Sequence, residues 1–362
     1  MKLIAFYLPQ YHRTPENDKW WGEGFTEWTN VRKAKPLFSG HYQPREPLGD
    51  NYYYILDPKV QKWQVETAKK YGIYGFCYYH FWFKGKQLLE KPLNQILKLG
   101  KPDFPFCLSW ANESWTLAWY GKKNVLIMKQ DYGNKDDWEI HFKYLLKVFT
   151  DKRYITVDGK PMFIIYRSYS IPDCDKMLEY WNERAIESGL KGIYFVETLS
   201  GIQRKSFCKN SKALVEFEPG YTFYSSDTPR QYTIKRKFRR LLKKMFPNKN
   251  YFLEMVDYDY FWSLILKRKN NICDKQIFPG GFIDWDNSPR RGNMGTIFKG
   301  ASPVKFEKYL IRQIKRVKEL YDSEFIFLNA WNEWGEGAYL EPDKKYGYGY
   351  LEAVRNALKE NY

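Results

Sequence analysis

Eight short apolar segments, spread over the whole chain and separated by helix-like segments, restrict the folds open to this sequence more than any other feature. They are KLIAFYLP (2–9), GIYGFCYYHFWF (72–83), FPFCLSWAN (104–112), PMFIIYRS (161–168), GIYFVETLS (192–200), ALVEFEP (213–219), IFPGGFIDW (277–285) and EFIFLNAWNEW (324–334). Near-continuous apolar runs of this length are typical of strands that are buried on both faces, as in parallel sheets.

Helical patterns stand between most of these segments. DPKVQKWQVETAKKYG (57–72) has Asp57 as a helix N-cap, Pro58 in the first turn and Gly72 just past the end. Similar patterns cover 134–149, 173–189, 302–321 and 348–361. Strand–helix alternation repeated eight times predicts an α/β fold, a single (β/α)8 TIM barrel over residues 1–362 with long βα loops. Residues 220–276 are too many for one crossover, so we expect an insertion there.

The expected insertion contains a basic amphipathic helix, IKRKFRRLLKKMFP (234–247). Seven basic residues lie between Lys235 and Lys244, and the apolar residues fall at helical spacing. Such a helix suits an anionic membrane surface; the alternative is a surface helix that covers the barrel and has a solvated basic face. The formal net charge of +17 also favours anionic partners, although diffuse lysine explains it equally well. No nucleic-acid motif accompanies the charge, so we expect no nucleic-acid partner.

Polar and aromatic residues follow the apolar segments, where a barrel carries its active site. Residues 20–53 form one unusually long connection of this kind, and the alternative there is a packed lid with structural duties only. The predicted substrate-binding residues are Tyr11, His12, Glu27, Trp28, His80, Trp82, Trp110, Asn112, Glu113, Trp115, Glu197, Glu218, Asp284, Trp331, Asn332 and Trp334. An aromatic content of 19% suits sugar faces stacked on rings, with a tyrosine-rich core as the alternative.

The segment FLNAWNEWGEGAYLEPD (327–343) carries three acids, Glu333, Glu336 and Glu341, among tryptophans. Glycosidic cleavage needs two carboxylates in different environments, one holding a proton to donate and one ionised. Glu333 and Glu336, three residues apart, are therefore the predicted catalytic pair. The alternative is an acidic turn at the surface.

We expect neither a metal nor a cofactor. Four histidines lack metal-ligand spacing, and no glycine-rich phosphate-binding pattern occurs. The triplets at 257–259 and 284–286 match the D-x-D of nucleotide-sugar enzymes, but a three-residue pattern is weak.

The cysteines and the chain start favour a reducing compartment. Cys77, Cys107, Cys174, Cys208 and Cys273 are scattered without C-x-x-C pairs, which predicts buried free thiols rather than disulfides. The first residues, MKLIAFYLPQYH, do not have the pattern of a signal peptide, and no apolar window is long enough to span a membrane. We therefore predict a cytoplasmic protein. The basic helix adds the alternative of a peripheral position at the inner face of the membrane.

Five motifs together resemble a known family. AFYLPQYH, WWGEGFTEW, GFCYYHFWF, SWANESW and NAWNEWGEG are similar to the WbsX-type glycosyltransferases, which resemble the glycoside hydrolase family 99 endo-α-mannosidase fold, and the likeness runs from residue 2 to about residue 350. The resemblance implies a (β/α)8 barrel and a role in bacterial surface polysaccharide (O-antigen or capsule) metabolism.

The resemblance also implies roles for the two acids. In the hydrolases a paired-Glu motif carries out retaining cleavage: one Glu assists the substrate's own 2-hydroxyl and the other protonates the leaving oxygen. By position, Glu333 corresponds to the base and Glu336 to the acid/base. Gly335 stands where those hydrolases tend to have His, so substrate contacts are expected to differ.

Three kinds of function follow from these observations. The first is a carbohydrate-active enzyme that acts on a glycosidic bond of an oligosaccharide or lipid-linked glycan, by hydrolysis, transglycosylation or true transfer from a nucleotide-sugar. The second is a non-catalytic glycan-binding barrel, and the third is a peripheral membrane scaffold that acts through 234–247.

Overall fold

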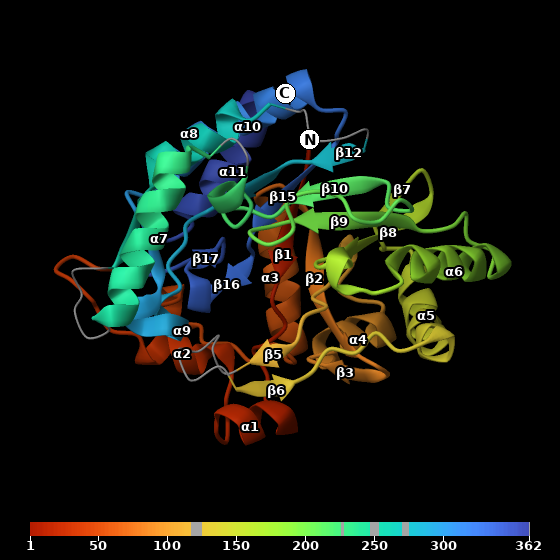
Figure 1. The fold of residues 1–362 in the computed structure, drawn as a ribbon. Helices are drawn as coiled ribbons and strands as arrows, with labels where there is room; N and C mark the ends of the chain where they lie inside the picture. Colours follow the sequence, from red (N-terminus) through yellow and green to blue (C-terminus); the bar gives the residue numbers. More distant parts are fainter. Residues whose placement is uncertain (117–124, 226–227, 247–252, 270–274, 362) are drawn as a thin grey trace.

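Eight parallel strands form a barrel at the centre of the molecule (Figure 1). The computed structural model describes residues 1–116, 125–225, 228–246, 253–269 and 275–361. The strands, in the order in which they pair, are β1 (Lys2–Tyr7), β2 (Ile73–Phe83), β4 (Phe106–Trp110), β8 (Lys160–Ile165), β9 (Tyr194–Leu199), β10 (Ala213–Glu216), β12 (Gln276–Phe278) with β13 (Gly280–Phe282), and β15 (Phe325–Asn329). Each lies in one of the eight predicted apolar segments or starts one residue before it, so the predicted (β/α)8 barrel is confirmed.

One interrupted strand closes the barrel. β12 pairs with β10, β13 pairs with β15, and β15 pairs with β1, all in parallel. Pro279 separates β12 from β13, and it has no backbone N–H to give to a ladder. Its carbonyl instead accepts a hydrogen bond from Phe327 N at 3.0 Å, which keeps the two pieces in line with β15.

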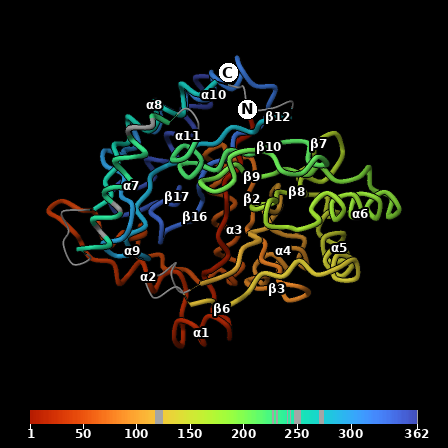
Figure 2. Tube along the Cα trace, viewed as in Figure 1, coloured from red at the N-terminus to blue at the C-terminus, as the bar shows by residue number. Residues whose placement is uncertain are grey.

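Helices surround the barrel, and both termini lie at the same end of it (Figures 1 and 2). The helices are α3 (Pro58–Lys70), α4 (Lys91–Leu99), α5 (Lys135–Phe149), α6 (Cys174–Glu187), α8 (Tyr258–Lys267), α10 (Pro303–Leu320) and α11 (Gly349–Glu360). Local chemistry sets their starts, because Asp57 accepts from Lys59 N at the start of α3 and Asn134 accepts from Asp136 N at the start of α5.

The connections at the carboxyl ends of the strands carry additional short elements. They are α1 (Pro15–Trp21), α2 (Glu27–Lys33), η1 (Leu48–Asp50), β3 (Lys86–Leu88), β5 (Trp115–Thr116), β6 (Leu126–Met128), η3 (Ser168–Ser170), η4 (Thr222–Tyr224), α9 (Ser288–Arg291), η6 (Gly292–Met294), β14 (Thr296–Lys299), β16 (Asn332–Glu333), η7 (Trp334–Glu336) and β17 (Ala338–Tyr339). Before β8, β7 (Thr156–Val157) forms a hairpin with it. These connections hold most of the site described below.

The predicted basic helix is present as α7 (Arg230–Met245). It lies at the periphery of the barrel, on the left of Figure 1. After it, β11 (Glu254–Asp257) pairs in parallel with β14, outside the barrel sheet. α8 follows and packs on the barrel, since Trp262 stacks on Phe282 with ring centroids 5.4 Å apart. The region 220–276 thus contains both additional elements and a barrel helix.

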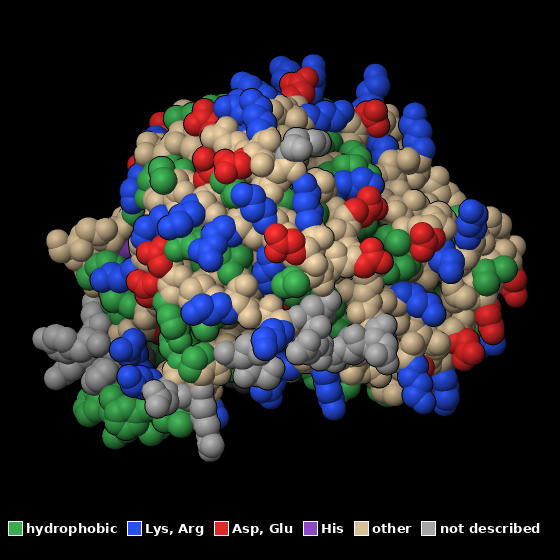
Figure 3. All heavy atoms as spheres, turned by 90° about the horizontal axis from the view of Figure 1, so that it is seen from above, with side chains coloured by type: hydrophobic (Ala, Val, Ile, Leu, Met, Phe, Trp, Pro, Cys, Tyr) green, Lys and Arg blue, Asp and Glu red, His purple; other side chains and the backbone are tan. Residues whose placement is uncertain are grey.

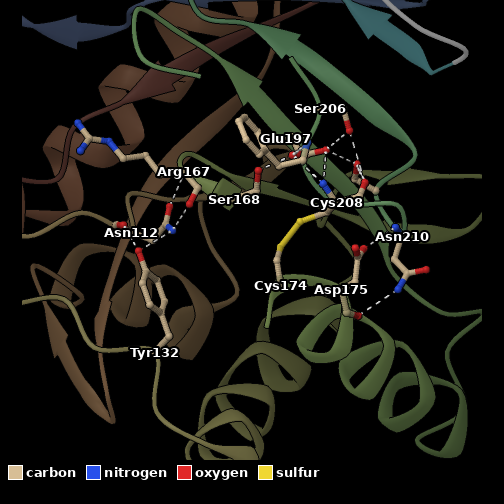
Figure 4. The surroundings of a disulfide bond; sticks show 12 residues. Asn112, Tyr132, Arg167, Ser168, Cys174, Asp175, Glu197, Ser206, Cys208 and Asn210 are labelled. Carbon is tan, nitrogen blue, oxygen red and sulfur yellow. Dashed lines mark hydrogen bonds between the residues drawn. A yellow bond between two sulfur atoms is a disulfide. The ribbon is translucent and has the colours of Figure 1, made fainter. Parts of the chain in front are cut away.

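The expectation of free thiols is right for two cysteines and wrong for two others. Cys77 and Cys107 are buried thiols. Cys174 and Cys208 form a disulfide (Figure 4), with their Cα atoms 6.2 Å apart. The pair is 34 residues apart in sequence, and it meets because the start of α6 packs beside the loop after β9. Cys273 lies outside the described residues.

Basic side chains are spread widely over the face drawn in Figure 3, where they outnumber acidic ones. Among the described residues, no helix combines the length and the apolarity needed to cross a membrane.

Candidate active site

A cavity of about 430 Å³ opens at the carboxyl ends of the barrel strands. This is the end at which barrels of this kind carry their sites, and the volume is in the usual range for small-molecule sites. The lining residues are Leu8, Gln10, Trp21, Tyr79, Phe81, Ala111, Glu113, Trp115, Thr116, Tyr166, Arg167, Phe217, Trp285, Asn287, Arg290, Arg291, Glu333 and Glu336. They come from the ends of every barrel strand except β9.

One arginine joins three carboxylates in the wall of this cavity. Arg290 Nη2 lies 2.8 Å from Glu333 Oε2, Arg290 Nη1 lies 2.8 Å from Glu336 Oε1, and Arg290 Nε lies 2.8 Å from Glu27 Oε1. The side chain of Glu333 is 7% exposed and that of Glu336 is 21% exposed. The two acids of the predicted pair therefore face the same space and share one guanidinium, with Glu27 behind them.

Three carboxylates and one guanidinium leave an excess of negative charge, which favours bound protons. Burial raises the pKa of Glu333 to about 8, because the opposing effect of Arg290 is smaller and the charges of Glu336 and Glu27 add to the increase. Burial also raises the pKa of Glu336, again against Arg290. Because the two groups interact, their titration belongs to the pair. At neutral pH the pair retains a proton.

A raised carboxyl pKa costs stability, which gives a first prediction. At pH 8, Glu333→Gln is expected to increase the free energy of unfolding by about 1–3 kcal/mol. Between the ordinary pKa of 4.5 and about 8, the folded protein holds a proton that the unfolded chain has lost, so stability falls as pH rises through this window. Thermal unfolding from pH 4 to pH 8 should show a gain that is absent at pH 4 and grows with pH. A gain that does not depend on pH would contradict the raised pKa.

Glu341 is buried beside this pair but does not line the cavity. Glu341 Oε1 accepts from Gln64 Nε2 at 2.7 Å, and Oε2 accepts from Trp334 Nε1 at 2.7 Å and from Tyr53 OH at 3.0 Å. Burial raises its pKa to about 7 in spite of these bonds. The third acid of the segment thus ties together the turn that carries the other two.

The same substitution at Glu341 is expected to have the opposite effect. Glu341→Gln should lower the free energy of unfolding at pH 8 by about 1–3 kcal/mol, because the new amide group turns a donor toward buried donors. Comparison of urea unfolding for Glu341→Gln and Glu333→Gln at pH 8 tests this contrast. Stabilisation by both changes would show that Glu341 is not a structural acceptor.

A second carboxylate–arginine pair stands across the cavity, where Arg167 Nη2 pairs with Glu113 Oε2. Burial raises the pKa of Glu113 to about 7 despite this partner. Asn112 fixes the arginine, since its Oδ1 accepts from Arg167 N at 2.8 Å and its Nδ2 donates to Arg167 O at 2.9 Å. The cavity therefore combines two acid–base clusters.

Aromatic rings form much of the remaining wall. Trp21, Tyr79, Trp115, Tyr166 and Trp285 line it together with Phe81 and Phe217. Burial raises the pKa of Tyr166, so its hydroxyl stays neutral at neutral pH. Flat apolar faces beside carboxylates and guanidinium groups match a sugar ring, which has apolar CH faces and a hydroxyl rim.

The long connection between residues 20 and 53 braces the acidic turn from behind. Asp286 Oδ2 accepts from Gln43 Nε2 at 2.7 Å and lies 2.8 Å from His41 Nε2, while Asp286 N donates to Glu336 O at 2.7 Å. Arg45 Nη1 donates to Gly337 O at 3.0 Å. Arg45 also pairs with Asp284, at 2.8 Å, which places that predicted binding residue in the brace.

Several predicted binding residues on the second and third strands point away from the cavity. His80 Nε2 lies 2.9 Å from His141 Nε2 of α5, and Trp82 stacks on the His141 ring with centroids 4.3 Å apart. Trp110 meets the same ring edge-on at 4.9 Å. Neighbouring residues of a strand point to opposite faces, so Tyr79 and Phe81, not His80 and Trp82, face the cavity.

Other predicted binding residues form the support beneath the acidic turn. Asn332 Oδ1 accepts from Leu8 N at 2.8 Å and so locks the end of β1 to the segment after β15. Tyr11 donates to Asn332 O, and His12 Nδ1 lies 2.9 Å from Pro9 O. Trp28 and Trp334 pack together at 5.4 Å, and Trp331 packs on Phe76 at 5.0 Å.

Glu197 and Glu218, also predicted to bind substrate, are occupied by structural partners. Glu197 organises the loop after β9 (Figure 4), accepting from Ser206 Oγ at 2.6 Å and from Ser211 Oγ at 2.5 Å. Burial raises its pKa, but hydrogen bonds, including one from Ser168, outweigh this and its pKa lies below the usual value. Glu218 pairs with buried Arg268 at 2.8 Å.

The cavity thus contains four predicted residues, Glu113, Trp115, Glu333 and Glu336, with Glu27 one contact behind. Arg290 was not among the predicted binding residues, although it stands just after the seventh apolar segment, where polar residues were expected to form the site. Within the described parts of the chain, no three His, Cys, Asp or Glu side chains are grouped to hold a metal ion.

Comparison with known proteins shows the family to which the chain belongs. The sequence model for glycosyltransferase WbsX matches residues 3–354. The chain belongs to the WbsX glycosyltransferase family. This WbsX-family chain is 35% identical over 361 residues to the uncharacterized protein WxcX of Xanthomonas campestris pv. campestris, in each of two strains. The matches cover 98% of the chain and 49% of WxcX, so the chain spans about half the length of these relatives.

Solved structures share the fold of this WbsX-family chain at low identity. The endo-alpha-mannosidase of glycoside hydrolase family 99 from Bacteroides thetaiotaomicron, in complex with BIS-TRIS-propane, matches with a TM-score of 0.55, 13% identity, and coverage of 99% of this chain and 96% of that one. A glycoside hydrolase-like protein matches with a TM-score of 0.57, 12% identity, and coverage of 98% and 93%. These matches agree with the barrel fold described above.

Proposed function

We propose that this protein acts on a glycosidic bond through Glu333 and Glu336. The observation that carries the proposal is Arg290, which brings both carboxylates to one wall of an aromatic-lined cavity, at 2.8 Å from each. Enzymes that cleave glycosidic bonds with two carboxylates hold them roughly 5–9.5 Å apart, and a guanidinium bound to both keeps these two carboxylates near each other. The retained proton supplies the acid that such chemistry needs.

The two acids divide the work in this proposal. Glu336, the more exposed of the pair, gives a proton to the leaving oxygen as the bond from the sugar carbon to that oxygen breaks. Glu333, as the base, accepts a proton from the substrate's own 2-hydroxyl as that oxygen bonds to the sugar carbon. The acceptor hydroxyl then replaces this bond, Glu336 takes the acceptor's proton, and Glu333 returns its proton to the 2-oxygen. These are the roles that the resemblance implies. When water is the final acceptor the result is hydrolysis, and when a sugar hydroxyl is the acceptor the result is transfer, so one pair serves both reactions.

Gly335 is required by this arrangement. A Cβ at this position would overlap Glu27 Oε1 and would lie 2.9 Å from Arg290 Nε. The space between the two acids is therefore filled by the Glu27–Arg290 ion pair instead of a side chain at residue 335. This accounts for the departure from the hydrolase pattern and suggests that Arg290, which lines the cavity and is held by Glu27, takes over the substrate contacts expected there.

Gly335→Ala is expected to lower turnover by at least about tenfold, because displacement of Arg290 by a fraction of an ångström misplaces both acids. Circular dichroism and the melting temperature should change little. The measurement is kcat of Gly335→Ala beside Gly347→Ala, a glycine that does not line the cavity and has nothing within 4 Å of its added Cβ, and whose φ of 55° costs alanine about 1 kcal/mol. Equal kcat values for the two variants would show that the reaction does not depend on Gly335.

The class of reaction is tested by mass spectrometry of products. The purified protein is given α-mannoside oligosaccharides alone and then nucleotide-sugars with acceptor glycans, beside a Glu333→Gln/Glu336→Gln control. Shortening of the oligosaccharide by the parent only indicates a hydrolase. Growth only with a nucleotide-sugar indicates a transferase. Binding of glycan without any turnover, retained in the control, would favour a non-catalytic glycan-binding barrel.

The biological setting is also a proposal. We infer a role in bacterial surface polysaccharide (O-antigen or capsule) metabolism, with an oligosaccharide or lipid-linked glycan as substrate. This rests on the family and on the resemblance of the motifs. The cytoplasmic location stays a prediction from the sequence, and the Cys174–Cys208 disulfide removes the support that scattered cysteines had given it.

A further inference from the structure

Helix α7 turns a stripe of large apolar side chains toward solvent. Ile234 is 56% exposed, Phe238 61%, Leu241 55% and Met245 61%. Their spacing of four, three and four residues places them on one face of the helix. Phe246, at the end of the helix, is 44% exposed. A contiguous exposed apolar stripe of this kind marks an interaction surface rather than scattered surface residues.

Basic side chains border the stripe on both sides. At 3.6 residues per turn, Lys237 and Lys244 fall along one edge, and Lys235 and Arg239 fall beyond the other. All four are exposed. No Asp or Glu occurs within Arg230–Met245. The hydrophobic side chains that gather at the lower left of Figure 3, on the side where Figure 1 places α7, lie beside blue basic groups.

The opposite face of α7 fastens it to the body of the protein. Arg236 pairs with Glu254 of β11 and lies over the Phe223 ring at 3.9 Å. Among the described side chains of α7, Arg236 is thus a basic residue used for packing, while Lys235, Lys237, Arg239 and Lys244 remain in solvent. The helix is held so that its apolar stripe points outward.

We propose that α7 docks on an anionic phospholipid surface. The stripe enters the boundary between headgroups and acyl chains, and the bordering Lys and Arg side chains meet lipid phosphates. A second copy of this chain fits less well, because a two-fold contact through α7 would oppose one basic helix to another. Nucleic acid would match the charge but would leave Phe238 and Leu241 without apolar contact.

Contacts lead from the docked helix to the candidate active site. Glu254 Oε2, beyond Arg236, accepts from Thr296 Oγ1 at 2.8 Å, and Thr296 N donates to Asn287 Oδ1 at 2.8 Å. Asn287 lines the cavity. Docking therefore holds the cavity near the membrane surface, where a lipid-linked glycan would present its sugars. This orientation rests on the proposed function, whereas the docking itself does not.

Vesicle flotation of the full chain tests the docking. The probes are vesicles of phosphatidylcholine alone and of phosphatidylcholine with phosphatidylglycerol. The charge variant is Lys235→Gln/Lys237→Gln/Arg239→Gln/Lys244→Gln, and its control removes four exposed lysines elsewhere, Lys59, Lys69, Lys147 and Lys308. The apolar variant is Phe238→Ser/Leu241→Ser, and its control is Ile186→Ser/Val304→Ser, whose side chains are 55% and 79% exposed.

We expect the parent and both controls to bind the anionic vesicles and to bind neutral ones at least about tenfold more weakly. The charge variant and the apolar variant should each lose at least about tenfold in affinity for the anionic vesicles. No binding by the parent, or parent-like binding by both variants, would overturn the proposal. Two other results would also overturn it. In the first, the parent forms a dimer that the apolar variant does not form, and neither binds vesicles; in the second, the parent binds an acidic peptide but no lipid. Vesicle binding is measured without turnover, so its result does not depend on whether the protein acts on a glycosidic bond.

Discussion

Glu333→Gln and Glu336→Gln should each lower kcat by about 10²–10⁴-fold on whichever glycan the parent converts, while leaving the protein folded. This is the usual contribution of a positioned general acid or base. The double variant should be little slower than the slower single variant, because the two acids act as one unit. The control is Glu183→Gln, an exposed acid of α6, which should keep the parental rate. Parental rates for both single variants would end the assignment.

The pH dependence of kcat/KM sharpens the same prediction. Because burial raises the pKa of Glu333 to about 8, the pair keeps its last proton up to that pH, and kcat/KM should fall above it as the acid is lost. The alkaline limb should move away from pH 8 in Glu333→Gln, because the remaining acid, Glu336, then titrates without its partner. A parental profile that stays flat through pH 8 would show that no shared proton is needed for the reaction.

Arg268→Met should lower the free energy of unfolding by about 3–5 kcal/mol, the largest stability loss we expect. Arg268 Nη1 lies 2.8 Å from Glu216 Oε1 and Arg268 Nη2 lies 2.8 Å from Glu218 Oε1, and all three side chains are at most 1% exposed. Removal of the guanidinium leaves two carboxylates in the interior without a counter-charge. Urea unfolding followed by tryptophan fluorescence measures the loss.

The control for this change is Arg184→Met. Arg184 also contacts two carboxylates, Glu139 and Glu187, but its side chain is 34% exposed, so the loss of stability should be much smaller than for Arg268→Met. If Arg268→Met does not fold, adding Glu216→Gln and Glu218→Gln should restore a folded protein, because the uncompensated charges are gone. A loss below 1 kcal/mol for Arg268→Met, or no recovery by the triple change, would contradict this account of the cluster.

The barrel could be predicted from the sequence because its strands are buried on both faces. Such strands read as apolar runs, and eight of them with helices between allow few other arrangements. The same property hides which residues face inward. In YYHFWF, the cavity takes Tyr79 and Phe81, while His80 and Trp82 face α5. When both faces of a strand are apolar, the alternation of side chains does not show which face points into the cavity. The predicted binding residues of this strand, His80 and Trp82, are those that face α5.

The pairing of charged side chains across the barrel could not be predicted from the sequence either. Glu333 and Glu336 stand out as acids in an aromatic segment, but Arg290, 43 residues before Glu333, carries no local mark of its role. The same applies to Arg268 and Glu218, which are 50 residues apart. Polar strand ends therefore looked alike in the sequence, although some face the cavity and others are neutralised in the interior. The disulfide between Cys174 and Cys208 was missed for the same reason.

Turnover of a glycosyl fluoride by the two single variants tests the paired-carboxylate account most directly. Fluoride departs without a proton, so a variant that lacks only the acid should regain its rate, whereas one that lacks the base should not. The account predicts that Glu336→Gln releases fluoride in its first turnover within about tenfold of the parent rate while remaining about 10²–10⁴-fold slow on the ordinary glycoside, and that Glu333→Gln is slow on both. Rescue of neither variant, rescue of Glu333→Gln alone, or parental turnover of the ordinary glycoside by either variant would contradict it.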